Sequence, residues 1–191
     1  MTETNDGKAL APKRADALKN RDHILKVAHD AFAQSGETSL NEIAKRAGIG
    51  AGTLYRHFPT REALILAVYG HDIDRLVASV ADLLAAGPAI EAFRSWFSTL
   101  ADYIRIKHGL GEALHSPAAQ EAIRSTYAPV IAAIDQLIAA CVAEGSMRAG
   151  VRGGDILILM GFLWRLPADA EGRQQAERMM TVVLRGLAVD V

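Results

Sequence analysis

Apolar residues recur three and four positions apart along most of this chain, and the two-residue alternation of a β-strand is scarce. That spacing gathers apolar side chains on one face of an α-helix, so the sequence predicts an all-α fold. We expect about nine helices. The clearest are expected near residues 20–35, 39–47, 53–58, 61–85, 89–107, 116–144, 155–164 and 171–187.

Several of these limits carry start and stop signals. Ser39 followed by Glu42 is a capping-box pattern, and Gly48 suits the left-handed residue that ends a helix. Ser116 before Pro117 is a strong start. Pro129 falls inside the same segment and predicts a kink, because proline lacks an amide donor.

Composition narrows the class of protein. The 191 residues are 50% hydrophobic and 23% charged, which allows one domain or two small ones and excludes a disordered chain. The single cysteine, Cys141, excludes an internal disulfide and a cysteine-based zinc site, as in a reducing cytosol. The first residues lack the apolar core of a signal peptide, and the apolar run Ile156–Trp164 is too short to cross a bilayer. We therefore expect a cytoplasmic protein.

Charge is divided unevenly along the chain. Residues 1–61 hold ten Lys or Arg against seven Asp or Glu, whereas residues 62–191 hold eleven against fifteen. A basic first third suggests a part that meets an anion, although an excess this small is also ordinary surface variation. Residues 1–18 show no apolar period and are expected to form a flexible arm.

The segment from Ser39 to Arg61 carries the functional signal. Two short helices are joined at Gly48–Gly50, the length of turn found in a helix-turn-helix. The second helix presents hydrogen-bond donors, an aromatic ring and a cation, which suits insertion into the major groove of DNA. The residues concerned are Thr53, Tyr55, Arg56 and His57.

Other interpretations of this segment are weaker. Gly48, Gly50 and Gly52 could form a nucleotide-binding loop, but no strand precedes them and their spacing does not fit. His57 could bind a metal, but no second ligand lies four residues away, so no metal site is predicted. A purely structural helical hairpin remains as the plain alternative.

The sequence TLYRHFPTREAL, at residues 53–64, resembles a signature of the TetR family of bacterial transcriptional regulators. The likeness extends from Ile24 to Val68 and includes Ala31-Phe32, Gly36 and Ala47-Gly48. It implies a DNA-binding domain over residues 19–65 and a helical domain for effector binding and dimerisation over residues 66–191. The implied DNA contacts are Ser39, Asn41, Ala51, Gly52, Thr53, Tyr55, Arg56, His57 and Arg61.

These contacts are expected to have different tasks. Ser39, Tyr55, His57 and Arg61 suit phosphates, which position the protein without reading sequence. Arg56 and Asn41 suit base edges, a guanine for arginine and an adenine for asparagine. Ala51 and Gly52 have no polar side chains, so part of the readout is expected to depend on DNA shape. The N-terminal basic residues are expected to reach the adjacent DNA backbone or the minor groove; they are Lys13, Arg14, Lys19 and Arg21.

The remaining two thirds predict a dimer interface and a ligand pocket. The helix near 155–164 is apolar almost all round and must be covered, either by a partner subunit or within its own. The expected interface comprises Ile156, Leu159, Met160, Leu163, Trp164, Met179, Val183 and Leu187. The expected pocket comprises Phe93, Trp96, Phe97, Leu100, Tyr103, Tyr127 and Ile131, although such a stripe also suits plain core.

Together these features predict a homodimeric repressor that binds a palindromic operator in double-stranded DNA and is released by a small-molecule effector of unknown identity. No cofactor and no membrane partner is expected. The alternatives are a helical partner-binding scaffold without DNA readout and an all-helical enzyme. The enzyme alternative is weak because the sequence shows no paired carboxylates, nucleophile–base pair or phosphate-binding loop on a plausible face.

Overall fold

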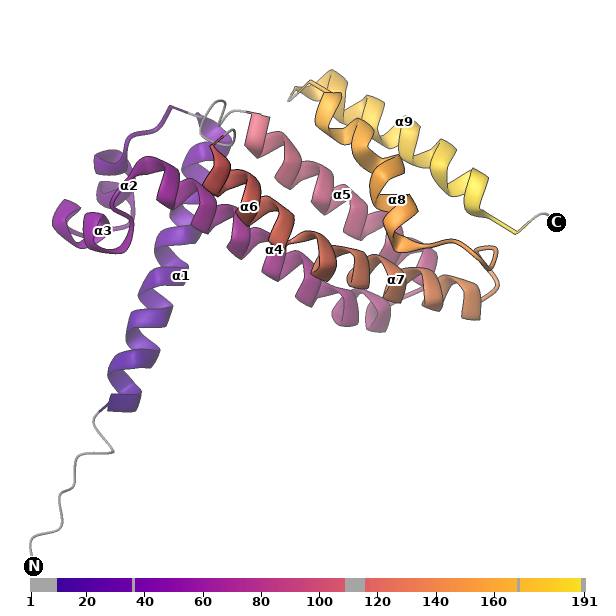
Figure 1. The fold of residues 1–191 in the computed structure, drawn as a ribbon, viewed down its shortest axis with the longest axis horizontal. Helices are drawn as coiled ribbons and strands as arrows, with labels where there is room; N and C mark the ends of the chain where they lie inside the picture. The colour runs from indigo at the N-terminus through magenta and orange to yellow at the C-terminus, as the bar shows by residue number, and fades with distance from the viewer. Residues whose placement is uncertain (1–9, 36, 109–115, 168, 190–191) are drawn as a thin grey trace, which may run out of the picture. The chain divides into compact units, whose positions relative to one another are not determined.

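The computed structural model describes residues 10–35, 37–108, 116–167 and 169–189. Within these ranges the chain forms helices α1 to α9 and one 3-10 helix, η2, and no strand, which confirms the all-α prediction (Figure 1). The chain divides into two compact units, residues 1–68 and 69–191. The sequence led us to expect a boundary after residue 65.

Unit 1 contains α1 (Leu10–Gln34), α2 (Leu40–Arg46), α3 (Ala51–His57) and the first residues of α4 (Arg61–Ala86). α1 begins ten residues before the expected start near Asn20, so part of the expected flexible arm is helical. Leu10 and Ala11 favour a helix, and Pro12 is tolerated because first-turn amides have no partner within the helix. Residues 1–9 of that arm lie outside the described residues. The core of unit 1 includes Ile24, Leu25, Ala28, Phe32, Ile43, Leu54, Phe58, Leu64 and Ile65.

Unit 2 is built from the rest of α4 and all later helices. These are α5 (Ala89–His108), α6 (Pro117–Ser125), α7 (Tyr127–Ala143), α8 (Gly153–Leu159), η2 (Met160–Arg165) and α9 (Ala170–Leu187). α7 packs against both α5 and α8 (Figure 1). Trp96 is fully buried among them, and its indole N–H donates to the Leu76 carbonyl oxygen at 2.8 Å.

The segment in which Pro129 predicts a kink is divided at Thr126, whose backbone angles stay in the right-handed helical region. α6 ends at Ser125 and α7 begins at Tyr127. Pro129 has no N–H for the carbonyl of Ser125, and its ring would clash with that carbonyl in a continuous helix. Because α7 begins at Tyr127, Pro129 lies in the first turn of that helix, where proline is tolerated.

The apolar stretch Ala119–Ala143 is long enough to cross a membrane by length and composition alone. It is interrupted at Thr126, and α7 contributes Ile134, Leu137 and Cys141 to the core of unit 2. About a third of this apolar window (33%) is buried within the fold.

Candidate DNA-binding and effector sites

The turn between α2 and α3 is held by local hydrogen bonds. The Ser39 hydroxyl accepts the Glu42 amide N–H at 3.2 Å, so Ser39 caps α2 as the sequence predicts. Gly48 has φ of 67°, a left-handed conformation that favours glycine. The Ile49 amide donates to the Ala44 carbonyl oxygen at 3.0 Å. These bonds give α3 a defined direction as it leaves the turn.

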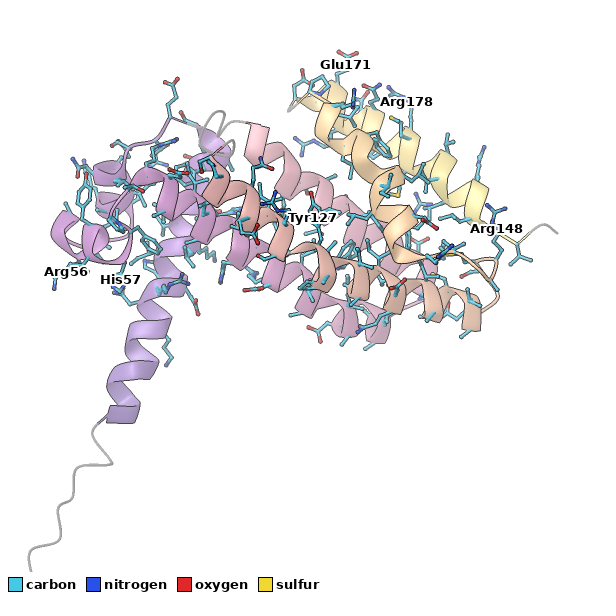
Figure 2. The ribbon with its side chains drawn as sticks, in the orientation of Figure 1. Arg56, His57, Tyr127, Arg148, Glu171 and Arg178 are labelled. Atoms are coloured by element: carbon cyan, nitrogen blue, oxygen red, sulfur yellow. The ribbon has the colours of Figure 1, made fainter. Side chains whose placement is uncertain are left out.

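α3 has one buried side and one exposed side. Leu54 and Phe58, one turn apart, are buried in unit 1. Tyr55, with 44% of its surface exposed, and Arg56 and His57 lie on the other side. Figure 2 shows Arg56 and His57 at the outer edge of α3, pointing away from the ribbon. The helix therefore presents polar and aromatic groups outward from a fixed apolar base.

Arg56 folds back onto its own helix. Its Nε–H donates to the Gly52 carbonyl oxygen at 3.1 Å, and one terminal amino group contacts the Thr53 hydroxyl at 3.4 Å. Both contacts are exposed, so a guanine edge or a phosphate could replace them at small cost. Thr53 is itself half-buried, which leaves it less reach than Arg56.

Arg61 has a structural contact as well as a position suited to DNA. It is the first residue of α4, and its guanidinium carbon lies 5.3 Å from the centre of the Phe32 ring. Arg21 makes a similar contact with Phe58 at 5.6 Å. Cations over aromatic faces are stabilising. The Thr60 hydroxyl accepts the Ala63 amide N–H at 3.0 Å and caps α4.

The other predicted DNA contacts lie at helix starts. Asn41 is exposed in the first turn of α2, and Ala51 and Gly52 are exposed in the first turn of α3. A Cβ added to Gly52 would meet no atom within 4 Å, so the backbone there is openly accessible. Lys19 is exposed on α1, whereas the side chains of Lys13 and Arg14 lie outside the described residues.

Unit 2 contains a cavity of about 600 Å³. It is lined by Tyr69, Ile73, Leu100, Tyr103, Thr126, Tyr127, Val130, Ile131, Gly154, Asp155, Leu157, Ile158, Met160 and Gly161. Four residues of the predicted pocket therefore come together here: Leu100, Tyr103, Tyr127 and Ile131. Of these, Tyr127 is labelled in Figure 2.

The other three predicted pocket residues are core. Phe93, Trp96 and Phe97 are fully buried, and Phe93 and Trp96 line neither this cavity nor a second one of about 610 Å³. Phe97 lines the second cavity, which is formed by residues of α5, η2 and α9. The spacing of aromatic residues along α5 does not show which of them are buried in the core and which line a cavity.

Sequence reasoning missed Tyr69 and Thr126. The two hydroxyl oxygens lie 2.8 Å apart, and the Thr126 hydroxyl also donates to the Ile123 carbonyl oxygen at 2.7 Å. Burial raises the pKa of Tyr69, although its hydrogen bond with Thr126 acts in the opposite direction. Burial, and then the charge of Asp72, raise the pKa of Tyr103. Because 57 positions separate Tyr69 from Thr126, only the fold brings them together.

Some of the predicted interface residues are buried within the subunit, and others are at least partly exposed. Ile156, Met160, Leu163 and Leu187 are buried within the subunit. Leu159 is 52% exposed, and Met179 and Val183 are half-buried. The side chain of Trp164 lies outside the described residues. Two apolar residues absent from the prediction are still more exposed, Ile158 at 81% and Val182 at 71%.

No group of three or more His, Cys, Asp or Glu side chains suited to a metal ion occurs among the described residues. Cys141 is buried, and that burial raises the pKa of its thiol. A thiol with a raised pKa is a weak nucleophile.

Two family models match the chain. Residues 24–68 match the bacterial regulatory proteins of the tetR family, and residues 88–189 match the C-terminal domain of SbtR-like transcriptional regulators. The second match spans more than half of the chain.

Solved structures show the same relationship. The TetR transcriptional regulator SCO0520 from Streptomyces coelicolor is 36% identical, with a TM-score of 0.78 over 90% of this chain and 99% of that one. A TetR regulatory protein from Mycobacterium vanbaalenii is 35% identical, with a TM-score of 0.74 over 93% and 100%. An HTH-type transcriptional regulator from Staphylococcus aureus, SAB2452, is 42% identical over 66 residues, which are 34% of this chain and 36% of that protein. The chain thus matches about a third of the length of that curated relative.

Proposed function

Because this chain belongs to the TetR family of bacterial DNA-binding transcriptional regulators and is not an enzyme, we propose that it is a homodimeric repressor released from its operator by a small molecule. Members of the family bind DNA and small-molecule effectors and are typically dimeric. DNA in a bacterium lies in the cytoplasm, so the proposed location is cytoplasmic.

The observation that carries the DNA-binding site is the two-sided character of α3. Leu54 and Phe58 fix the helix in unit 1, and Tyr55, Arg56 and His57 face solvent. We assign Arg56 and Asn41 to base edges, and Ser39, Tyr55, His57 and Arg61 to phosphates. The remaining expected contacts, Ala51, Gly52 and Thr53, would bring the start of α3 close to the DNA backbone.

Dimerisation would supply two such helices. Ile158, Leu159 and Val182 expose apolar surface on α8 and α9, and a second copy of the same surface is the natural cover for it. A two-fold dimer presents its reading helices to half-sites about 34 Å apart, which explains why a palindromic operator is expected.

α4 offers a route from effector to DNA-binding unit. Its first turns, with Leu64 and Ile65, belong to unit 1, and Tyr69 and Ile73 further along the same helix line the cavity of unit 2. An effector that fits only one position of α4 would favour that position and change operator affinity. A 100-fold release requires about 2.7 kcal/mol of coupling between the two sites.

The experiment is an anisotropy titration of the full-length protein with a fluorescent fragment from upstream of its own gene. We expect tight binding to one palindromic site and an affinity that falls steeply with salt, because neutralised phosphates release counterions. Equal affinity for a scrambled fragment at every salt concentration would contradict the proposal and favour a scaffold without DNA readout.

A further inference from the structure

The cavity of unit 2 has a buried floor and an exposed rim. Ile73, Leu100 and Met160 line it and are buried in the core of the unit. Ile158 and Tyr127 line the same cavity, although 81% and 51% of their surfaces are exposed. The cavity therefore opens to the surface between α8 and the start of α7, where Figure 2 labels Tyr127.

The side chains around this cavity favour an uncharged ligand. Most of the wall is aliphatic or aromatic. Asp155 is the one Asp, Glu, Lys, Arg or His among the described lining residues. Its side chain is 73% exposed, and a carboxylate oxygen lies 3.7 Å from the Arg152 Nε, so water and Arg152 already meet its charge. An uncharged, largely apolar molecule therefore suits the cavity.

The exposed rim continues into the apolar surface that we assign to the dimer. Ile158 belongs to both, because it lines the cavity and also exposes apolar surface beside Leu159. Leu159 and Val182 line neither cavity, so a ligand would not cover them. Members of the family are typically dimeric, and a two-fold dimer buries the same patch on both subunits. A second copy that covers Leu159 and Val182 would therefore also cover Ile158 at the opening of the cavity.

We propose that the effector cavity is open in a single subunit and is closed by the second subunit, so that an uncharged apolar effector binds the dimer more tightly than the monomer. The inference rests on the dimer and the effector site proposed above. A tenfold difference in affinity corresponds to about 1.4 kcal/mol, which the partner supplies by burying about 55 Å² of apolar ligand surface.

Titration of the full-length protein with N-phenyl-1-naphthylamine, an uncharged apolar dye that becomes fluorescent when it leaves water, tests this coupling. Val182→Asp should give a monomer, because it places a charge in the interface, and Val182 does not line the cavity. We expect this monomer to bind the dye about tenfold more weakly than the unaltered dimer does. Equal affinity of monomer and dimer for the dye, or no dye binding by the dimer, would overturn the inference.

Ala139→Asp is the matched control. It introduces the same charge at an exposed position of α7 that does not line the cavity, so the protein should stay dimeric and keep the dye affinity of the unaltered chain. Sedimentation velocity gives the oligomeric state of each variant, and circular dichroism shows that its helices are retained. A Val182→Asp protein that stays dimeric would contradict the interface on which the inference rests.

The unaltered protein provides a second test that needs no substitution. Coupling is reciprocal, so a dye that prefers the dimer must also strengthen dimerisation. A dimer has two cavities, and a tenfold preference at each should strengthen dimerisation by about 100-fold when the dye is saturating. Sedimentation with and without the dye measures this change. A dimer dissociation constant that the dye leaves unchanged would overturn the inference.

The location of the site is tested separately. Ile131→Trp places a larger side chain in the cavity wall on α7, away from the proposed patch on α8 and α9, so the protein should stay dimeric and lose most of its dye binding. Unchanged dye binding in that variant would overturn the cavity as the site.

Operator titration of the unaltered protein tests the repressor role without any dye. A dimer that binds its operator and holds the dye no better than the monomer does would refute this inference alone. A dimer that closes over the dye and shows no preference for its operator would refute the repressor role alone.

Discussion

Two arginines of the DNA-binding unit have different surroundings. Arg56 is exposed, and both of its described contacts are to groups on its own helix. Arg61 is half-buried with its guanidinium over the Phe32 ring, so it also helps to hold α4 against α1. We therefore expect the removal of each side chain to have a different signature.

Arg56→Ala should reduce discrimination between operator bases by about 1–3 kcal/mol and leave the free energy of unfolding nearly unchanged. Arg61→Ala should weaken binding to all DNA sequences alike, flatten the salt dependence, and lower the free energy of unfolding by about 0.5–1 kcal/mol through the lost ring contact. Affinity for operator and scrambled DNA, together with urea unfolding, measures both. The reverse pattern of specificity would contradict the division of tasks.

Sequence predicts the exposed residues of this site better than their partners. Tyr55, Arg56 and His57 follow from helical spacing once Leu54 and Phe58 are recognised as the apolar side. The ring contact of Arg61 and the Tyr69–Thr126 bond join residues far apart in the chain, and no local pattern encodes them. Phe93 and Trp96 were predicted in the pocket and lie in the core. Local spacing does not separate the two locations, because both depend on which helices pack around α5.

Among the helices, the close approach of α7 and α8 depends on one glycine. The Gly153 amide donates to the Asp135 carboxylate at 2.6 Å. A Cβ at Gly153 would lie 2.7 Å from both the Asp135 carboxylate oxygen and the Ile131 carbonyl oxygen. One of these neighbours is backbone, so α8 would have to move away from α7.

Gly153→Ala should lower the free energy of unfolding by about 1–3 kcal/mol, the usual cost of overpacking. Gly154→Ala is the matched control, since a Cβ there meets no atom within 4 Å and the change should be neutral or stabilising by up to about 1 kcal/mol. Urea unfolding of both proteins gives the comparison. Equal stability of the two variants would show that the α7–α8 contact is looser than described.

Helix limits were predictable where the signal is chemical and local. Ser39 and Ser116 act through hydroxyls that accept nearby amide N–H groups, and Gly48 and Pro117 act through their backbone geometry. The structure confirms the limits that they predict. Tertiary packing decides the others. The helix expected to end near Trp164 changes to a 3-10 helix at Met160, a tightening common at helix ends, close to the weak helix former Gly161.

At the scale of the whole molecule, the proposed dimer rests on apolar side chains that the subunit itself leaves exposed. Sequence does not distinguish the face of residues 156–164 that the subunit leaves exposed, because both sides of this segment are apolar. The structure buries Ile156 and Met160 and exposes Ile158 and Leu159. The period of a uniformly apolar helix does not show which side meets the core.

Ile158→Asp should therefore dissociate the dimer without unfolding the subunit. The free energy of dimerisation should weaken by about 3 kcal/mol, because a two-fold dimer contains one altered side chain in each subunit. Sedimentation velocity should show a monomer with an unchanged helical circular dichroism spectrum. Ala139→Asp, at an exposed position of α7, is the control and should remain dimeric. A fully dimeric Ile158→Asp protein would reject this interface.

The central claim is that the start of α3 lies against the phosphates of duplex DNA, and the operator affinity of Ala51→Glu tests it most directly. Ala51 is exposed in the first turn of α3, where a carboxylate is compatible with the helix dipole, so the thermal transition should be preserved. The same carboxylate would face phosphates, and anisotropy titration should show operator binding weakened by about 100-fold or more. An Ala51→Glu protein that folds normally and binds its operator with unchanged affinity would contradict the account.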